Sequence, residues 1–187
     1  MTKYTQPSAC YLRWQPIDAL RPAMSAPWWR WVASTDSLTA RLIAAGQPRP
    51  FRVRLLRQGV GVAERDEALA LGLAPRRLTW LREVALCVDD TAWVVARSVA
   101  PLDQLQGQHL DRLGERSLGS WLFRQPDLVR GPLFATGQCP MFAARLAPSC
   151  ASGVWARRSV FYHGGLSLLV QEAFLSTMAD DLGFASR

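Results

Sequence analysis

The stretch Thr79–Pro101 constrains the fold more than any other part of the sequence. Two runs rich in Trp and Val, Trp80–Cys87 and Trp93–Pro101, flank the short polar segment Val88–Ala92. Runs of this length and composition around a short connection are typical of a β-hairpin. The sequence therefore predicts an antiparallel sheet organised around this hairpin.

Each strand of the hairpin carries one arginine within an apolar row. Side chains alternate between the two faces of a strand, so we expect Arg82 and Arg97 each to share a face with apolar neighbours. These neighbours are Trp80, Val84 and Leu86 on the first strand, and Trp93, Val95 and Val99 on the second. Two interpretations remain open: an arginine at the sheet edge whose head reaches solvent, or a guanidinium that binds a carboxylate in a dry pocket.

The composition is that of an ordinary globular protein. The chain has 187 residues, of which 49% are hydrophobic and 20% are charged, so a single domain with a substantial core is expected. We expect residues 1–16 to be a loose leader and residues 17–187 to form the domain. The apolar runs are too short to span a bilayer and the start lacks a secretory pattern, which predicts a cytoplasmic protein. The scattered Cys and His residues do not have the spacing of a zinc site or a disulfide framework.

The charge is basic, at +7 from 22 Lys and Arg against 15 Asp and Glu. Basic proteins can bind nucleic acid or an acidic membrane, but the arginines are spread along the chain without a nucleic-acid-binding signature. Arg52, Arg54 and Arg57 come closest to a patch, and they alternate with apolar residues as on a solvated strand face. A small anionic ligand also suits this charge.

Caps, glycines and alternation predict the other elements. Ser34–Ser37 offers N-caps before Leu38–Ala45 and the closing Gly46, which indicates a short amphipathic helix. Most of Arg124–Ser152 is expected to be loop. The remaining predictions are a strand at Pro50–Ala63 with bulges at Gly59 or Gly61, a brief helix in Glu64–Gly72, a helical connection at Leu102–Arg112, a strand at Asp127–Ala135 and a second hairpin that turns at His163–Gly165.

Two further positions are candidates for a binding site. Ser117 is a natural N-cap, which would leave the backbone N–H groups of Leu118 and Gly119 without a helical partner. Glu172 interrupts an apolar strand face, where a buried charge is costly unless it is paired; the alternative is that strand twist carries it to the rim. Folded together with the hairpin arginines, these groups would bind a small organic acid and supply a carboxylate for acid–base chemistry.

Five blocks in this order resemble the chorismate lyase family, over about Trp31 to Leu175. They are Trp80–Glu83, Trp93–Arg97, Leu118–Phe123, Trp155–Ser159 and Gln171–Leu175. The resemblance implies an α+β fold: a single antiparallel β-sheet with helices packed on it and helical flaps covering an internal ligand pocket. It also implies elimination of pyruvate from chorismate to give 4-hydroxybenzoate for ubiquinone biosynthesis, with no metal or cofactor. Because the product keeps the contacts with the same arginine and amides, we expect slow product release and strong product inhibition.

The resemblance implies residue roles as well. Arg82 matches the arginine that binds the ring carboxylate, Leu118 the residue whose backbone N–H assists, and Glu172 the glutamate at the hydroxyl end of the ring. Leu38 occupies a flap position where the family usually has methionine, and Arg97 matches a second pocket arginine of the family. We therefore expect Glu172 and Arg97 to be catalytic, and Leu38, Arg82, Leu118 and Glu172 to bind substrate and product.

Two departures and one alternative accompany this resemblance. Leu38 replaces methionine, and Arg124–Ser152 is longer than the family segment and carries Cys139 and Cys150. The alternative is a non-catalytic sensor module of the same fold that binds small aromatic acids. In some bacterial transcription regulators such a module follows a DNA-binding helix-turn-helix. The segment Met1–Ala33 is too short and too interrupted by proline to form that motif. We expect a monomer that binds chorismate and 4-hydroxybenzoate, without nucleic-acid binding or stable membrane insertion.

Overall fold

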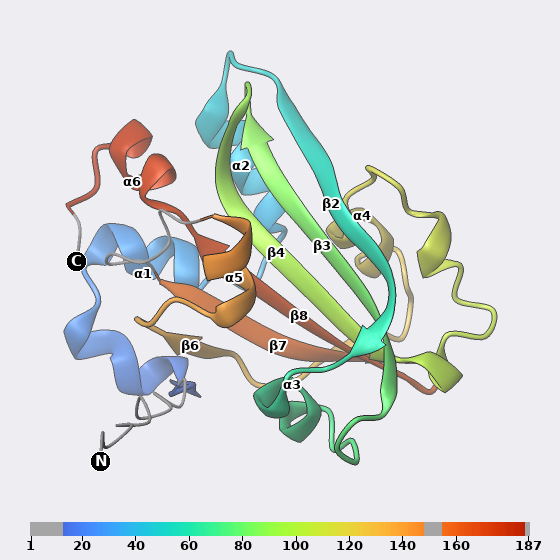
Figure 1. The fold of residues 1–187 in the computed structure, drawn as a ribbon. Coiled ribbons are helices and arrows are strands. Elements are labelled where there is room, and N and C mark those ends of the chain that lie inside the picture. The colour runs from blue at the N-terminus through green and yellow to red at the C-terminus, as the bar shows by residue number, and fades with distance from the viewer. Residues whose placement is uncertain (1–12, 148–154, 186–187) are drawn as a thin grey trace, which may run out of the picture.

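One antiparallel β-sheet organises the chain, as the sequence predicts. The computed structural model describes residues 13–147 and 155–185. Within these residues the sheet has eight strands in the order β1-β6-β7-β8-β4-β3-β2, with β5 paired to β7 (Figure 1). The strands are β1 Gln15–Pro16, β2 Phe51–Val62, β3 Leu78–Val88, β4 Thr91–Pro101, β5 Val129–Arg130, β6 Phe134–Thr136, β7 Ala156–His163 and β8 Leu166–Phe174.

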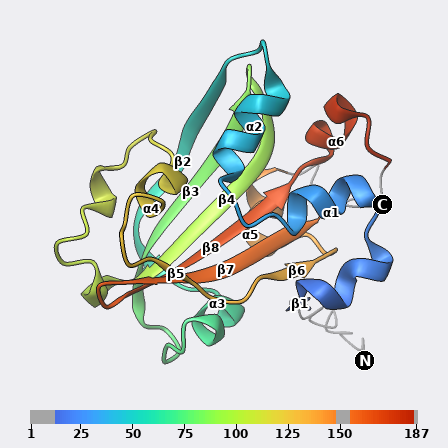
Figure 2. The same cartoon turned by 180° about the vertical axis from the view of Figure 1, so that it is seen from behind.

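Short helices lie against both faces of the sheet. They are η1 Ile17–Ala23, α1 Ala26–Val32, α2 Leu38–Gly46, α3 Arg65–Ala70, η2 Leu102–Gln104, η3 Leu110–Arg112, α4 Leu118–Leu122, α5 Met141–Leu146 and α6 Ser176–Leu182. Helices α2 and α4 lie over the face seen in Figure 2, whereas α5 lies over the opposite face seen in Figure 1. The predicted α+β class, with a single antiparallel sheet and helices packed on it, is confirmed. No helix of the described residues is long and apolar enough to cross a membrane.

The register of the central strands decides which side chains face which layer. Arg82 on β3 pairs with Ser98 on β4, whereas Glu83 pairs with Arg97. Because neighbours along a strand point to opposite faces, Arg82 and Arg97 lie on opposite faces of the sheet. The same register carries on through β8 and β7, where Ser98 pairs with Val170 and Val170 with Ser159.

The hairpin turn explains why Trp93 and Arg97 do not share a face, although alternation predicted that they would. The turn lies at Asp89 and Asp90 and is shorter than the predicted connection. The register then shifts, since Leu86 pairs with Val94 but Cys87 pairs with Ala92. Trp93 is the extra residue of this β-bulge, and it packs in the same core cluster as Leu86. A bulge changes the alternation of the strand that carries it, so Trp93 and Arg97 do not share a face.

Helix α2 forms where the sequence predicts it. The Ser37 side chain accepts a hydrogen bond from the Ala40 N–H, which caps the first turn. Leu38 and Leu42 are buried against the sheet, and burial of a leucine side chain contributes about 1.5–3 kcal/mol. These contacts fix α2 over the sheet, with its first turn beside the candidate site.

Other predictions are confirmed or corrected in detail. The irregularity in β2 lies between Leu55 and Arg57, not at the predicted glycines. Gln15–Pro16, part of the predicted leader, pairs with β6. The segment predicted to be loop contains helix α5, whose Phe142 and Ala143 are buried against the sheet. Cys10 and Cys150 lie outside the described residues, while Cys87 is a small residue buried in the core.

Candidate functional site

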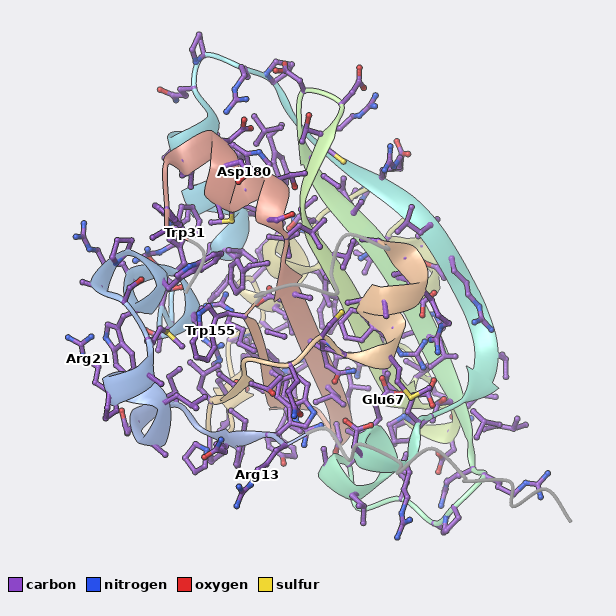
Figure 3. All side chains as sticks on the ribbon, turned by 60° about the vertical axis from the view of Figure 1, so that its left-hand side comes forward. Arg13, Arg21, Trp31, Glu67, Trp155 and Asp180 are labelled. Atoms are coloured by element: carbon purple, nitrogen blue, oxygen red, sulfur yellow. The ribbon has the colours of Figure 1, made fainter. Side chains whose placement is uncertain are left out.

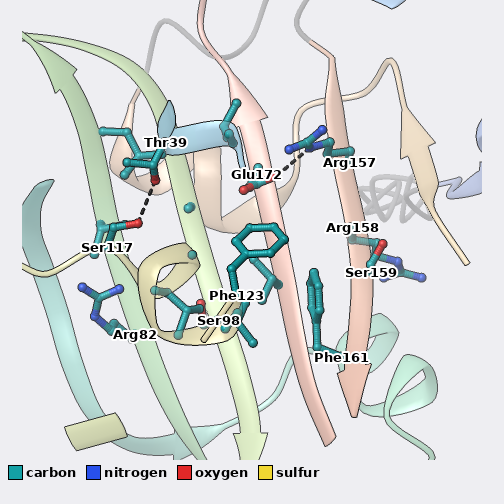
Figure 4. A pocket seen from close by; sticks show the side chains of 18 of the residues that line it. Thr39, Arg82, Ser98, Ser117, Phe123, Arg157, Arg158, Ser159, Phe161 and Glu172 are labelled. Atoms are coloured by element: carbon teal, nitrogen blue, oxygen red, sulfur yellow. Dashed lines mark hydrogen bonds and ion pairs between the residues drawn. The ribbon is translucent and has the colours of Figure 1, made fainter. Parts of the chain in front are cut away.

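A pocket lies between the sheet and the helices α2 and α4. Its walls include four of the residues that the sequence predicts to bind ligand, namely Leu38, Arg82, Leu118 and Glu172. They come from four separate elements, α2, β3, α4 and β8. Figure 4 shows Arg82 and Glu172 on different strands of the floor. The fold therefore brings together residues that are up to 134 positions apart in the sequence, from 38 to 172.

Arg82 is a buried cation without an anionic partner among the described residues. Arg82 is only 2% exposed. Its Nη2 donates hydrogen bonds to the backbone oxygens of Gly114 at 2.9 Å and Arg116 at 2.8 Å. Its buried Nε has no hydrogen-bond partner in that part of the chain. Burial lowers the pKa of Arg82 to about 10, so the group is still positively charged at neutral pH. An unpaired N–H on a buried guanidinium favours binding of a carboxylate.

Glu172 is paired, which resolves the alternatives left open by the sequence. Its Oε2 lies 2.6 Å from Nε of Arg157, directly across on β7. Arg157 Nη1 also donates to the backbone oxygens of Trp31 and Ser34 and to Oγ of Ser34. The Glu172 side chain is 18% exposed and that of Arg157 only 3%. The carboxylate is therefore fixed through Oε2, and Glu172 lines the pocket.

The prediction that Arg97 lines this pocket is wrong. Arg97 projects from the opposite face, where its Nε lies 2.7 Å from Glu67 Oε1 and its Nη1 lies 2.5 Å from Glu83 Oε1. Gln171 also donates to Glu67 Oε1 at 2.6 Å. Figure 3 shows Glu67, which belongs to α3, beside the strands of the sheet. The guanidinium and both carboxylates are almost fully buried, so this cluster joins α3 to the sheet and does not face ligand.

Ser117 occupies the predicted N-cap position, but its side chain has a different partner. It makes no capping hydrogen bond to α4. Instead, a hydrogen bond of 2.7 Å joins its Oγ to Oγ1 of Thr39, in the first turn of α2 (Figure 4). Both residues line the pocket. This bond links the two helices that lie over the ligand space.

The sequence did not reveal the role of two arginines in this pocket. Arg157 and Arg130 both line it. Arg130 Nε donates to Oγ of Ser159 at 3.1 Å, its Nη1 donates to the backbone oxygen of Thr35, and its guanidinium carbon lies 5.3 Å from the centre of the Phe161 ring. Arg130 lies within a segment rich in Pro and Gly and sits in a two-residue strand, so no periodic pattern marks it.

Arg158 follows Arg157 in the sequence, but its side chain points away from the pocket. Its Nη1 donates to Asp66 Oδ2 at 2.9 Å, and its guanidinium stacks over the Trp14 ring at 4.4 Å. Figure 4 shows the Arg158 side chain pointing away from Glu172. The guanidinium of Arg158 therefore packs on the opposite face of the sheet, although other atoms of Arg158 border the pocket.

Comparisons with known proteins agree with the geometry. The sequence profile of a family described as chorismate lyase matches residues 9–181. A relative from Chromohalobacter salexigens, named probable chorismate pyruvate-lyase, is 56% identical over 174 residues, covering 93% of this chain and 94% of the relative. A relative of the same name from Pseudomonas savastanoi pv. phaseolicola is 42% identical, covering 91% of this chain and 89% of the relative.

Solved structures share the fold at much lower sequence identity. PhnF from Mycobacterium smegmatis superposes with a TM-score of 0.55 at 16% identity, covering 81% of this chain and 68% of that one. The separate effector domain of PhnF gives a TM-score of 0.53 at 15% identity, covering 77% of this chain and 91% of that one. At such identities the likeness shows the fold alone.

Proposed function

The chain belongs to the chorismate lyase family and is a lyase, and from this premise we propose that it eliminates pyruvate from chorismate to give 4-hydroxybenzoate for ubiquinone biosynthesis. The observation that carries the proposal is the buried Arg82, which has a free Nε in a pocket that also holds Glu172. The Arg82 cation suits the acid group at one end of the ring, and the Glu172 carboxylate suits the hydroxyl at the other end.

The binding mode follows from these two groups. The ring carboxylate accepts hydrogen bonds from Arg82 Nε and from the backbone N–H of Leu118, which also lines the pocket. The hydroxyl at the far end of the ring lies at Glu172, and Leu38 packs over the ring from α2. Because the Arg82 Nη2 is already bonded to the chain before α4, the guanidinium is oriented before ligand binds. Such preorganisation reduces the entropy lost on binding.

The chemistry requires only positioning and one proton transfer. Glu172 removes the proton from the ring carbon that bears the hydroxyl, and the neighbouring carbon loses the enolpyruvyl oxygen, so that the ring becomes aromatic. Arg157 keeps Oε2 occupied, and the other oxygen, Oε1, is the one that reaches the substrate. Positioned acid–base groups of this kind contribute about 10²- to 10⁴-fold, and the fixed geometry of the pocket adds to this.

Product release is expected to be slow. 4-Hydroxybenzoate retains the ring carboxylate and the hydroxyl, so it keeps the contacts with Arg82 and Glu172 that hold the substrate. The bond between Thr39 and Ser117 connects the helices over it, and opening of such covers limits turnover in many enzymes. We further propose a monomeric, cytoplasmic enzyme, which sedimentation and cell fractionation will test.

The proposal is tested by incubating purified protein with chorismate. Pyruvate is followed by a coupled assay and 4-hydroxybenzoate by chromatography, and the two are expected in equimolar amounts. Absence of turnover together with tight binding of 4-hydroxybenzoate would contradict the enzymatic proposal and favour a small-molecule sensor. The fold shared with the PhnF effector domain makes that outcome the relevant alternative.

A further inference from the structure

We propose that Arg130 binds the second carboxylate of the substrate, the one on the enolpyruvyl group, in the place expected for Arg97. This inference rests on the proposed function, because chorismate carries two carboxylates and Arg82 accounts for only one. Arg97 is excluded by its position on the other face, between Glu67 and Glu83. A second cation must therefore come from another element that borders the pocket.

Of the arginines that border the pocket, Arg130 is the one suited to a second anion. Arg157 is already paired with Glu172 and bonded to the chain near Ser34, and Arg158 is paired with Asp66. Arg130 donates only to neutral oxygens, those of Ser159 and Thr35. It forms no ion pair with any carboxylate of residues 13–147 and 155–185. A half-buried guanidinium in this state retains its charge for a ligand.

The electrostatic setting supports the same conclusion. Burial lowers the pKa of Arg130, and the nearby positive charge of Arg157 lowers it further, against the smaller opposing influences of Glu172 and Asp36. Both effects disfavour the charged form of an arginine that has no counter-ion. A carboxylate bound beside Arg130 offsets this penalty, which favours binding of an anion at this end of the pocket.

The position of Arg130 matches the shape of chorismate. Arg130 lies on β5 opposite Phe161 of β7, on the side of the pocket where Glu172 and Arg157 pair. Arg82 lies on β3, and β4 and β8 separate that strand from β7, a span of about 14 Å for three interstrand spacings. In chorismate the enolpyruvyl ether is attached next to the hydroxyl carbon and away from the ring carboxylate. A ring held by Arg82 and Glu172 thus places its enolpyruvyl group on the side of Arg130.

The reaction itself gives this contact a distinct consequence. The base takes the proton from the hydroxyl-bearing carbon, the electrons of that C–H bond form the new ring double bond, and the neighbouring C–O bond breaks. The oxygen leaves with its electron pair as enolpyruvate, which takes up a proton at its methylene carbon to become pyruvate. Arg130 neutralises the carboxylate of this departing group, and the retained product, 4-hydroxybenzoate, has no atom left at Arg130.

Substrate and product therefore differ in their dependence on this residue. Arg82 contacts a group present in both molecules, whereas Arg130 contacts a group present only in the substrate. Loss of a hydrogen bond to a charged group corresponds to about 10- to 100-fold in affinity or rate. For Arg130→Gln we expect kcat/KM for chorismate to fall by this factor while the Kd of 4-hydroxybenzoate changes less than about twofold.

The experiment compares Arg130→Gln with Arg82→Gln, with the exposed Arg54→Gln on β2 as a control that removes the same charge. Calorimetry gives the Kd of 4-hydroxybenzoate, and steady-state assays give kcat/KM. Arg82→Gln is expected to weaken both, and Arg54→Gln neither. Arg130→Lys separates charge from structure: it keeps the cation but loses the fork that bonds Ser159 and Thr35, and it is expected to restore part of kcat/KM.

Three results would overturn the assignment: equal losses for substrate and product in Arg130→Gln, no loss for either, or no rescue by lysine in a folded variant. Failure of the proposed function is a separate result, namely a wild-type protein that does not turn over chorismate. In that case calorimetry with chorismate still tests Arg130. The assignment then predicts that Arg130→Gln weakens chorismate binding but not 4-hydroxybenzoate binding, and equal effects would contradict it.

Discussion

Arg157 and Glu172 are cross-strand partners whose Nε and Oε2 lie 2.6 Å apart at the edge of the pocket. The arginine is fixed at its other end by the chain that enters α2, through Ser34. The ion pair thus connects the carboxylate proposed to react to the segment that leads into one of the covering helices. The pair engages Oε2 of Glu172, and Oε1 is the oxygen proposed to reach the substrate.

Glu172→Gln is expected to lower the turnover of chorismate by about 10²- to 10⁴-fold, because an amide does not accept the ring proton. Binding of 4-hydroxybenzoate is expected to persist, since the amide still hydrogen-bonds a hydroxyl. Pyruvate release and calorimetry measure the two effects, and the exposed Glu115→Gln serves as the control. Full turnover by Glu172→Gln would show that another group moves the proton.

Arg97 is expected to determine stability and not ligand binding. Removing one partner of a buried ion pair costs about 3–5 kcal/mol. Without Arg97, Glu67 retains hydrogen bonds from neutral groups, and Glu83 retains the longer contact of 3.6 Å with Arg145. Arg97→Met should therefore lower the free energy of unfolding by this amount in urea titrations, whereas the exposed Arg54→Gln should change it by less than about 0.5 kcal/mol.

A combined variant distinguishes this structural role from a chemical one. Replacing Arg97 by Met together with Glu67→Gln and Glu83→Gln removes all three charges, and it should be less destabilised than Arg97→Met alone. The folded protein should retain the 4-hydroxybenzoate affinity of the wild type. A variant that is as stable as the wild type but inactive would instead restore Arg97 to the reaction.

The hydrogen bond between Thr39 and Ser117 is expected to slow the release of 4-hydroxybenzoate. Thr39→Val keeps the shape of the side chain and removes the hydroxyl, and a net hydrogen bond is worth about 0.5–1.5 kcal/mol. The dissociation rate should rise by about 2- to 10-fold, as measured by stopped-flow displacement. If product release limits turnover, the initial burst of pyruvate seen with the wild type should also become smaller.

Ser117→Ala is the matched partner for this test. Because one bond joins the two side chains, the double variant should release product no faster than either single variant. Additive effects would mean that Thr39 and Ser117 act separately. A trace without a burst in the wild type would contradict slow release altogether.

Arg82→Lys is not expected to preserve binding. Lysine has the charge but lacks the planar group that bonds Gly114 and Arg116 through Nη2 while leaving Nε for the ligand. The Kd of 4-hydroxybenzoate should rise by about 10- to 100-fold. Calorimetry checks this, and an affinity equal to that of the wild type would mean that charge alone holds the carboxylate.

Local patterns were sufficient for much of the fold. Trp and Val runs predicted the β3–β4 hairpin, and the Ser37 cap with its apolar spacing predicted α2. Alternation within a single strand also placed Arg82 on one face with Trp80, Val84 and Leu86, because β3 is regular on either side of that position. These features depend on neighbours in sequence, which is why the sequence predicts them. The pocket role of Arg82 was implied by the family resemblance and not by alternation.

Long-range register accounts for what the sequence did not predict. A shift of one residue between strands moves a side chain to the other face, and the bulge at Trp93 separates that residue from the face of Arg97. Arg130 enters the pocket through a strand of two residues whose position depends on pairing with β7. No local pattern specifies either event, so the second cation of the site emerges only from the folded chain.

The most direct test of this account is the position of bound 4-hydroxybenzoate in a crystal structure of the complex. The account predicts a carboxylate within hydrogen-bond distance of Arg82 Nε, with the hydroxyl toward Glu172 and no ligand atom bonded to Arg130. A carboxylate bound at Arg130, or a ligand outside the pocket between the sheet and the helices α2 and α4, would contradict it.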